Sequence, residues 1–277
     1  MDEAKIQDIE IGLFLEALFQ RYDYDFRNYA KASLKRRVLA LAAAERLTVA
    51  ELIPLVLRGE DYLTEVIAQL SVPVSEMYRD PPVFKALRET VLPLLQTYPR
   101  INVWQAGCAT GEEVYSLAIM LEEEGLLERT QIYATDINDI ALHKAEDGIF
   151  PVLNLADFEK NYKNAGGKSR LADYYVANAD FFRIHKRLRQ KIVFAHHNLV
   201  SDGVFCEVQL ILCRNVLIYF NDELQKRVLE LFHNSLVRGG FLCLGTRESL
   251  RSIERQRLFA AHQADCMIFH KNGIMAE

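Results

Sequence analysis

The chain has 277 residues, half of them hydrophobic, and a formal net charge of −5 at pH 7. This length allows one large domain or two modest ones with a substantial core. The negative charge argues against a general nucleic-acid-binding protein. The N-terminus lacks a basic-then-apolar signal pattern, and no run approaches the ~18 apolar residues of a membrane span. We therefore expect a cytoplasmic protein without direct membrane insertion.

Five cysteines are arranged in a way that argues against both a disulfide framework and a metal site. They form no C-x-x-C pair, their number is odd, and Cys108, Cys213 and Cys243 lie in or beside apolar runs. This usage is typical of buried free thiols in a reducing compartment. His196 and His197 are adjacent and would face opposite sides of a strand, so we expect no metal site there.

Residues 1–75 are expected to form a small all-helical domain. Apolar residues recur at helical spacing, with stripes that predict helices at about 32–45 and 60–70, and Thr48 suits the N-cap of a helix between them. Residues 21–47 hold seven Lys or Arg against three acids. This basic segment indicates either a docking surface for an acidic partner or an ordinary solvated face.

The remainder, residues 76–277, is expected to form an α/β domain. Asp80-Pro81 predicts a helix with Asp80 as its N-cap that runs to about Leu95. Beyond it, strands and helices alternate, which indicates a mostly parallel sheet with helices on both faces. The expected strands are 101–105, 131–135, 192–195, 208–213, 240–244 and about 265–270. The expected helices are 111–124, 138–146 and 222–237, the last capped by Asn221 or Asp222 and ended by Gly239-Gly240.

An insertion interrupts this alternation at about residues 155–190. It combines a turn-prone stretch, residues 164–167, with strand-prone side chains, so we expect a small antiparallel β subdomain. Nine Lys or Arg against three acids in residues 159–191 make it basic. The strand-prone residues are Tyr162, Tyr174, Tyr175, Val176, Phe181, Phe182 and Ile184.

The first strand leads into a turn that suits a nucleotide-like cofactor, because such ligands bind outside the carboxyl ends of parallel strands. Gly107 allows close backbone approach to a ligand, and Gly111 a tight entry to the next helix. Ala109 breaks the G-x-G-x-x-G fingerprint of dinucleotide sites. Glu112 and Glu113 either serve the helix dipole alone or also attract a ligand with cationic groups, since they repel phosphate.

Polar residues follow other strands at the same expected edge. Asp136 ends the second strand, where a carboxylate suits the hydroxyls of a ribose. Arg214-Asn215 ends a later apolar strand and is placed for ligand contact, as is Asn198. Tyr219 is expected either to contact the ligand or to be ordinary core. Arg79, at the domain junction, either lies on a surface linker or reaches into a cleft to hold a carboxylate.

Five segments in chain order complete a pattern. Ser75–Asp80 matches T-x-F-F-R-D/E, with Ser for Thr and with Met and Tyr for the two Phe. Trp104–Ser116 matches W-x-A-G-C-A/S-T-G-E-E-P-Y-S with Val for Pro, and Ala134–Ile137 matches A-T-D-I. His197–Leu199 matches H-N-L, and Ile211–Phe220 matches I/L-x-C-R-N-V-x-I-Y-F. From about residue 30 to 270 the chain resembles the chemotaxis receptor glutamate methyltransferases, the CheR family.

The resemblance implies a fold and a reaction. The fold is an N-terminal helical domain plus a Rossmann-like S-adenosylmethionine-dependent methyltransferase domain, with a mostly parallel seven-stranded sheet and an inserted antiparallel β subdomain. The reaction transfers the methyl group of S-adenosylmethionine to glutamate γ-carboxylates of a chemoreceptor and leaves S-adenosylhomocysteine. Arg79 and Tyr219 would stand nearest the reacting groups. The expected cofactor-binding residues are Ser75, Arg79, Ala106, Gly107, Glu112, Asp136, Asn198, Leu199, Asn215 and Val216.

The resemblance also implies partners. The first basic helix would face the acidic coiled-coil cytoplasmic region of chemoreceptors, and an edge of the β subdomain would bind a receptor tail by strand addition. A glutamate carboxylate is ionised at pH 7, so the reaction needs no general base and no Cys/His or Ser/His pair. The expected receptor-docking residues are Lys31, Lys35, Arg36 and Arg37.

Three other interpretations remain open. Ala109 and the adjacent pair of glutamates disfavour an NAD-dependent dehydrogenase. Nucleic-acid methylation is a second interpretation. It is disfavoured because Arg214-Asn215-Val216 stands where amine-methylating enzymes of that class usually carry an acid or Asn followed by Pro-Pro-aromatic. A non-catalytic signalling scaffold that binds S-adenosylmethionine is the main alternative, and the retained Arg79 and Tyr219 make it less favoured.

Overall fold

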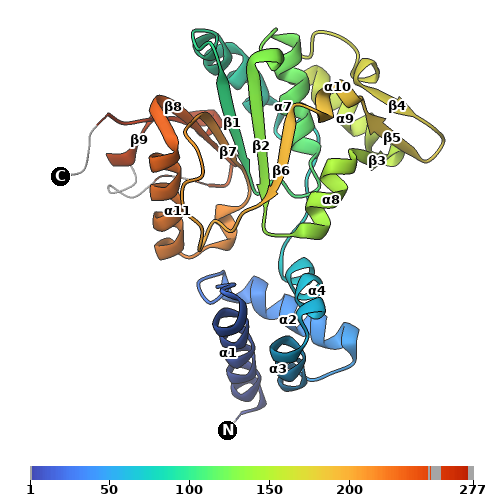
Figure 1. Ribbon diagram of the computed structural model, residues 1–277, viewed down its shortest axis with the longest axis vertical. Helices are drawn as coiled ribbons and strands as arrows, with labels where there is room; N and C mark the ends of the chain where they lie inside the picture. Colours follow the sequence, from blue (N-terminus) through green and yellow to red (C-terminus); the bar gives the residue numbers. More distant parts are fainter. Residues whose placement is uncertain (1, 249, 251–256, 274–277) are drawn as a thin grey trace.

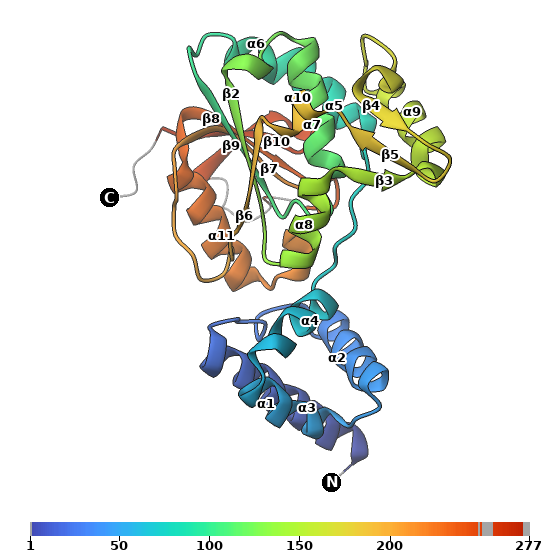
Figure 2. The ribbon, with the colours of Figure 1, turned by 45° about the vertical axis from the view of Figure 1, so that its right-hand side comes forward.

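The computed structural model describes residues 2–248, 250 and 257–273 (Figure 1). A helical domain lies at one end of the molecule, and an extended stretch of chain leads from it into a larger α/β domain (Figure 2). The four helices of the helical domain are α1 (Glu3–Tyr22), α2 (Lys31–Glu45), α3 (Val49–Arg58) and α4 (Glu60–Leu70).

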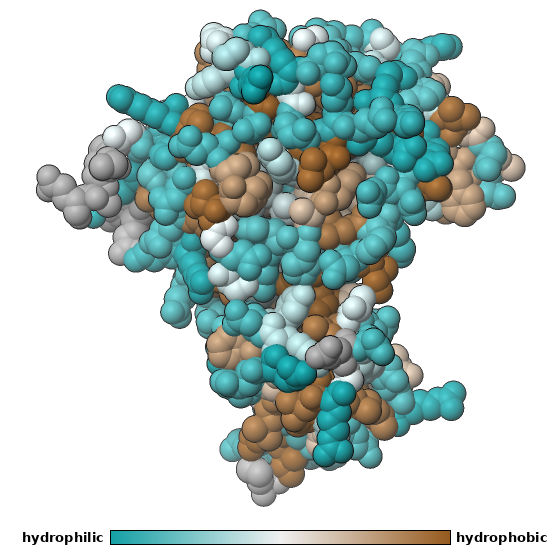
Figure 3. All heavy atoms as spheres, in the orientation of Figure 1, coloured by the Kyte–Doolittle hydropathy of each residue, from teal (hydrophilic) through white to brown (hydrophobic). Residues whose placement is uncertain are grey.

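The helical domain is built around its own core. Phe14, Leu18 and Val38 are fully buried there, as expected where apolar residues recur every three to four positions. Thr48 starts α3 with a capping box, because its hydroxyl accepts the Glu51 N–H while the Glu51 carboxylate accepts the Thr48 N–H. On the face shown in Figure 3, apolar residues gather over these helices, whereas hydrophilic residues cover most of the α/β domain.

A seven-stranded sheet forms the centre of the α/β domain. The strand order is β6-β2-β1-β7-β8-β10-β9, and β10 runs antiparallel to both of its neighbours whereas the other pairs are parallel. The fold is thus the mostly parallel Rossmann-like arrangement that was expected. The strands are β1 (Ile101–Ala106), β2 (Thr130–Asp136), β6 (Ile192–His196), β7 (Val208–Cys213), β8 (Leu236–Leu244), β9 (Phe259–Gln263) and β10 (Ile268–Lys271).

Helices cover both faces of the sheet and divide the core in two. Successive residues of β1 alternate between the faces, so that Val103 packs with the core under α7 (Glu112–Glu123) and Trp104 with the core under α11 (Asp222–Ser235). Helix α8 (Asp139–Asp147) follows β2. The carboxyl ends of β1, β2 and β6 all point toward the helical domain (Figure 1), which places that domain over the edge where ligands bind in this fold.

The helix expected over 80–95 is present but irregular. It consists of α5 (Pro81–Ala86), a π-helical turn at Leu87–Val91 and α6 (Leu92–Leu95). Asp80 does not cap it: its φ is 54° and its side chain makes no cap hydrogen bond. That carboxylate accepts a hydrogen bond from Arg214 instead, which removes it from the helix terminus.

Two expectations near the C-terminal end are wrong. Helix α11, capped by Asn221 as expected, ends at Ser235 rather than at the glycine pair, and β8 begins at Leu236. Gly239, with φ of +74°, lies where the register between β7 and β8 shifts, so the glycines serve a strand irregularity. Strand β9 was not expected, because its sequence, FAAHQ, has little of the β-branched character of a strand.

The insertion contains a helix as well as the expected small sheet. Strands β3 (Ile149–Pro151), β5 (Phe181–Ile184) and β4 (Tyr175–Ala177) form an antiparallel sheet in that order. Residues from 155 onward form α9 (Leu155–Asn164), so the strand expected around Tyr162 is wrong. Phe158 and Tyr162 lie four residues apart and are both buried on one helix face, a spacing that suits a helix. A short helix, α10 (Lys186–Arg189), leads to β6.

Within the described part of the chain, no helix has the length and apolar character needed to cross a membrane.

Candidate cofactor-binding site

A cavity lies between the carboxyl ends of the strands and the helical domain. A larger chamber and a smaller one adjoin and share five lining residues, Val74, Gly107, Ala109, Arg214 and Asn215. The larger chamber is also lined by Asp136, His197, Asn198, Leu199, Val216 and Tyr219 from the α/β domain, and by Phe26, Tyr29, Ser33 and Arg37 from the helical domain. The smaller chamber is also lined by Ser75, Glu76, Arg79, Gln105, Cys108 and Glu113.

The turn after β1 depends on glycine at two positions. Gly107 has φ of +73°, and a Cβ there would lie 2.4 Å from a methyl carbon of Val216. Gly111 has φ of +92°, and a Cβ there would lie 2.8 Å from the Cβ of Ala145 in α8. Gly107 therefore lets the loop after β7 close onto the turn, and Gly111 lets α7 start against α8. The approach at Gly107 thus brings the loops after β1 and β7 together at the cavity, and the approach at Gly111 packs two helices beside it.

Asp136 fastens this turn to the end of β2. Its Oδ2 accepts the Ala109 N–H at 2.8 Å, and its Oδ1 accepts the Asn138 N–H at 3.0 Å. Burial raises the pKa of Asp136, although the backbone donors oppose that effect. The carboxylate lines the cavity and retains lone pairs for further donors, such as the hydroxyls of a ribose.

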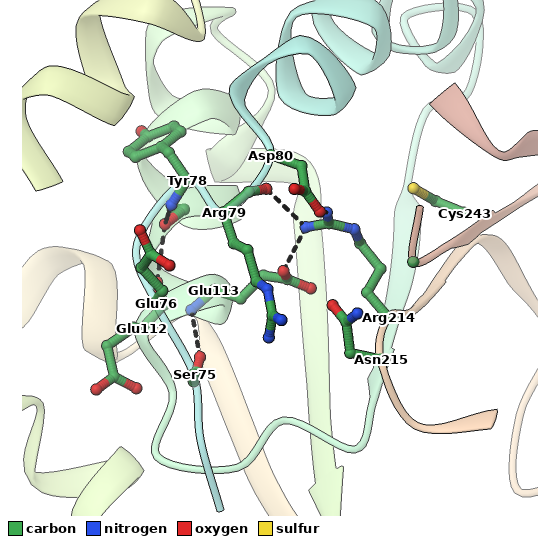
Figure 4. Close-up of polar contacts among 12 residues, drawn as sticks. Ser75, Glu76, Tyr78, Arg79, Asp80, Glu112, Glu113, Arg214, Asn215 and Cys243 are labelled. Atoms are coloured by element: carbon green, nitrogen blue, oxygen red, sulfur yellow. Dashed lines mark hydrogen bonds and ion pairs between the residues drawn. The ribbon is translucent and has the colours of Figure 1, made fainter. Parts of the chain in front are cut away.

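Arg214 is a buried structural cation rather than the free ligand contact that its place after β7 suggested. Its side chain is 0% exposed; Nη1 donates to Glu113 at 2.5 Å and to the Arg79 carbonyl at 3.0 Å, and Nη2 donates to Asp80 at 2.7 Å (Figure 4). Gln105 donates to the other oxygen of Glu113. Burial opposes the charge of Arg214, but the two carboxylates outweigh it and hold its pKa above the usual value.

Arg79 lies between two residues with left-handed backbone. Tyr78 has φ of 52° and Asp80 has φ of 54°, a conformation that costs a non-glycine residue roughly 1–2 kcal/mol. Tyr78 is held because its N–H donates to the Ser116 hydroxyl at 2.9 Å and its buried ring packs on Phe84. Arg79 lines the smaller chamber, and its guanidinium makes no hydrogen bond or ion pair within the described residues (Figure 4).

Asn215 is fixed through its backbone by a buried carboxylate. Its φ is 61°, and its N–H donates to Glu248, which also accepts the N–H groups of Gly245 and Ile218. Burial raises the pKa of Glu248. The Oδ1 of Asn215 is buried without a partner among the described residues, which is the state of an acceptor awaiting a ligand donor.

The turn after β6 contributes Asn198 and Leu199, both of which line the larger chamber. Asn198 is held by its own turn, because its side-chain oxygen accepts the Val200 N–H at 3.0 Å and its N–H donates to Asp202 at 2.8 Å. His196 lies apart from the cavity lining, with Nδ1 2.9 Å from Asp139, whereas His197 lines the cavity.

Most of the expected cofactor-binding residues meet at this cavity. Two of them, Ala106 and Glu112, are buried and are not among its lining residues. Glu112 instead accepts a hydrogen bond from Thr110, and the next acid, Glu113, faces the smaller chamber. Those that line it are Ser75, Arg79, Gly107, Asp136, Asn198, Leu199, Asn215 and Val216, and Tyr219 does so as well.

The four expected docking residues of α2 do not share one surface. Lys31 and Arg36 are exposed, and Lys35 pairs with Asp8 of α1 at 2.6 Å. Arg37 turns into the cavity and donates to the Ser71 carbonyl at 2.6 Å, so we remove it from the docking set. It points the other way because it is three positions from Leu34, on the inward side of the helix.

Residues missed from the sequence fall into two kinds. Gln105, beside the Gly turn, was not considered, and Glu113 was considered together with Glu112 but left out of the expected cofactor-binding residues. Glu248 follows the apolar end of β8, so the rule that identified Asp136 and Asn215 applies to it equally. The aromatic lining from the helical domain, Phe26 and Tyr29, has no comparable signal, because only the packing of the two domains places it there.

The sheet order, the Gly turn and the polar strand ends define an α/β enzyme with a cavity for a nucleoside-type cofactor. Comparison with known proteins narrows the class. The family model for the CheR methyltransferase SAM binding domain matches residues 73–266, and that for the CheR methyltransferase all-alpha domain matches residues 9–71.

Individual relatives agree with the family models. A Pseudomonas putida protein named "Putative methyltransferase Cher3" is 51% identical over 251 residues, which cover 90% of this chain and 92% of that protein. A Listeria monocytogenes chemotaxis protein methyltransferase is 30% identical over 229 residues, covering 82% of this chain and 84% of the relative. Chemotaxis protein methyltransferase 2 of Vibrio cholerae is 30% identical over 275 residues, covering 91% and 90%.

The chain therefore belongs to the CheR methyltransferase family, and its cofactor is S-adenosylmethionine. The cavity fits that cofactor. Asp136 offers acceptors suited to ribose hydroxyls, the Oδ1 of Asn215 has no partner among the described residues, and Arg79 brings a positive charge to the smaller chamber, which suits a carboxylate.

Proposed function

We propose that this protein transfers the methyl group of S-adenosylmethionine to glutamate γ-carboxylates in the cytoplasmic region of a chemoreceptor. The observation that carries the proposal is Arg79: a cation is fixed by its neighbours at the wall of the cofactor cavity, yet its guanidinium has no partner among the residues that the structure describes. A guanidinium in that state is suited to hold a carboxylate. The names of the relatives from Listeria and Vibrio support a substrate in chemotaxis.

The reaction requires little of the protein beyond placement of the acceptor and the methyl donor. S-adenosylmethionine, when bound, supplies an activated methyl group, which bonds to a carboxylate oxygen as its bond to sulfur breaks and the electron pair stays on sulfur. The acceptor carboxylate is already ionised near neutral pH, so no side chain has to remove a proton. The contributions left to the chain are alignment of acceptor and methyl group and exclusion of water.

Each side chain of the cavity then has a role. With the cofactor bound, Asp136 would accept hydrogen bonds from the ribose hydroxyls, Asn198 and Leu199 would line its pocket, and Asn215 would accept a hydrogen bond from it. Arg79 orients a carboxylate, either that of the acceptor or that of the methionine part. Tyr219, on the wall nearest the helical domain, borders the entry of the acceptor.

Receptor recognition is assigned to two exposed surfaces. Lys31 and Arg36 of α2, with Lys35 beside them, face solvent next to the cavity and suit an acidic coiled coil. In the subdomain sheet, β4 is an edge strand, and its Val176 is 64% exposed. An extended receptor tail is expected to add to that edge.

The first experiment is isothermal titration with S-adenosylmethionine and S-adenosylhomocysteine, followed by a methylation assay. Micromolar binding that Asp136→Ala abolishes, together with base-labile methyl esters on a receptor fragment, is the expected result. Cofactor binding with no methyl ester on any receptor fragment from the same genome would favour the signalling scaffold instead.

A charge reversal tests the docking surface separately. Arg36→Glu with Lys31→Glu is expected to raise the KM for the receptor fragment roughly tenfold, because two attractive contacts become repulsive. The Kd for S-adenosylmethionine should stay unchanged, since neither side chain lines the cavity. An unchanged KM for the receptor would remove α2 from the docking surface.

A further inference from the structure

The loop between α1 and α2 makes a main-chain contact with the segment that carries Tyr219. Tyr29 and Phe220 form an isolated antiparallel β-bridge. On one side of it the Ala30 N–H donates to the Tyr219 carbonyl at 2.7 Å, and on the other the Asn221 N–H donates to the Asn28 carbonyl at 2.9 Å. This isolated β-bridge and its two flanking hydrogen bonds join the helical domain to the α/β domain.

Side chains reinforce the same contact. The Nδ2 of Asn221 donates to the Oδ1 of Asn28 at 3.0 Å, and the rings of Tyr29 and Phe220 lie 4.9 Å apart at 70°. Tyr29 also packs on Phe26, which is fully buried in the core of the helical domain. The bridge is therefore anchored in a folded core on the side of the helical domain, rather than in a free loop.

The position of the bridge links the two functional surfaces. Ala30 is the N-cap residue of α2, so the exposed docking residue Lys31 follows it directly. Across the bridge, Tyr219 ends a single 3₁₀ turn, and its carbonyl accepts the Ala30 N–H. A displacement of the start of α2 would therefore move the backbone of Tyr219.

We propose that residues 28–30 position Tyr219, so that a receptor that engages α2 also sets the geometry of the methyl-transfer site. The inference rests on the proposed function for its consequence in catalysis. It assigns the helical domain a second role beyond docking. Asn28, which does not line the cavity, and Ala30, which lines it but bonds to Tyr219 through its N–H, are then positioning residues that act through Tyr219.

Ala30→Pro removes one of the two main-chain donors of this contact, the one that bonds directly to Tyr219. The φ of Ala30 is −59°, which proline adopts without strain, and the N-cap position needs no N–H for the helix itself. The ring methylene cannot fit where an N–H now lies 2.7 Å from the Tyr219 oxygen. Glu3→Pro is the matched control, because it places a proline at the start of α1, far from Tyr219.

The expected result is a split between turnover and affinity in the full-length protein. Loss of one such hydrogen bond corresponds to about a fivefold effect. With tritiated S-adenosylmethionine and a purified chemoreceptor cytoplasmic fragment, Ala30→Pro should lower kcat about fivefold or more at saturating substrates, and Glu3→Pro should not. A change confined to the KM for the receptor would reduce the loop to part of the docking surface and overturn the inference.

A second variant and a second readout keep the test independent of folding and of substrate. Asn28→Ala removes only the side-chain contact to Asn221 and should lower kcat in the same direction by about twofold. Hydrogen exchange of the amides of residues 217–221 needs no receptor: it should accelerate in Ala30→Pro and not in Glu3→Pro. Unaltered exchange there would overturn the inference, whereas a wild-type protein that methylates no receptor would overturn only the proposed function.

Discussion

Two buried arginines each form an ion cluster with two carboxylates, in two different regions of the molecule. Arg214 pairs with Glu113 and Asp80 at the wall of the cofactor cavity. Arg88 pairs with Glu123 and Glu124, both at 2.6 Å, where α7 meets the inserted subdomain. In both, burial opposes the arginine charge and the two carboxylates outweigh it, so that the pKa of each guanidinium is raised.

The difference lies in what else each cluster holds. Arg214 also donates to the carbonyl of Arg79, inside a loop with left-handed backbone on both sides of that residue. Glu123 of the other cluster accepts hydrogen bonds from the hydroxyls of Tyr162 and Tyr174 and from the Lys168 N–H, all in the subdomain. Similar buried ion clusters thus serve a reactive loop in one case and the attachment of a subdomain in the other.

Arg214→Ala should have the largest effect of any single change and should affect both stability and cofactor binding. It leaves the buried carboxylate of Glu113 without its cation and removes a partner of Asp80, whose side chain is 34% exposed, which together cost roughly 3–5 kcal/mol of the free energy of unfolding. It also frees the Arg79 loop, so the binding of S-adenosylmethionine should be lost. Urea unfolding and isothermal titration measure the two effects. Arg214→Lys is the control, because it keeps the charge but not the paired geometry, and should recover stability more than binding.

Arg88→Ala tests whether the two clusters really differ in function. The free energy of unfolding should fall by about 2–3 kcal/mol, less than for Arg214, because Lys168 still pairs with Glu124 at 2.8 Å. The Kd for S-adenosylmethionine should change by less than about twofold, since no member of the cluster lines the cavity. A large loss of affinity in a folded Arg88→Ala protein would break the distinction between the two regions.

Sequence patterns identified the strand ends of the site but not the partners of the charged residues. The apolar strands, the Gly turn, Asp136 and Asn215 follow from local rules, because the polar residue after a buried parallel strand necessarily lies at the ligand edge. Whether Arg214 contacts the ligand or a carboxylate is decided by Asp80, more than 130 positions away. Only the assembled fold brings those two groups to 2.7 Å.

Helix α9 and Arg37 also show where interpretation of the local sequence failed. The strand expected around Tyr162 was extended from the aromatic stretch that follows it, although α9 itself, LADFEKNYKN, holds few strand-forming residues. Phe158 and Tyr162 pack into one core from the same face of the helix, a spacing that the sequence already contained. Arg37 belonged to a basic run that looked uniform, although its spacing from Leu34 turns it inward, and the structure shows that this side of α2 faces the cavity.

Asp136 sharpens the comparison, because it is a carboxylate of the cavity with backbone donors in place of an arginine. Burial raises its pKa in the folded protein above the unfolded value, so ionising it opposes folding at high pH, and its contribution to stability improves as pH falls toward the unfolded pKa. Cofactor binding has the opposite sign, since it needs the ionised form. The affinity for S-adenosylmethionine should therefore weaken as pH falls through the raised pKa.

Asp136→Asn is the control for this dependence. At pH 8 it should weaken the binding of S-adenosylmethionine about 10- to 100-fold, the size of a lost charge-assisted contact. As the pH is lowered from 8, its affinity should change less than that of the wild type. A variant that retains the full pH dependence would assign the titration to another group.

Glu248→Gln should have the smallest effect and tests positioning through the backbone alone. Glu248 accepts the N–H groups of Gly245 at 2.6 Å, Asn215 at 3.1 Å and Ile218 at 3.3 Å, and its two oxygens serve both sides of the turn. Glutamine replaces one acceptor with a donor that faces an N–H, at a cost of about 1 kcal/mol, or roughly fivefold in the Kd for S-adenosylmethionine. Because one of these contacts fixes the left-handed backbone at Asn215, the loss should appear as faster cofactor dissociation in stopped-flow measurements. If binding and dissociation are both unchanged, the turn is held by Val216 against Gly107, and the buried carboxylate contributes only to packing.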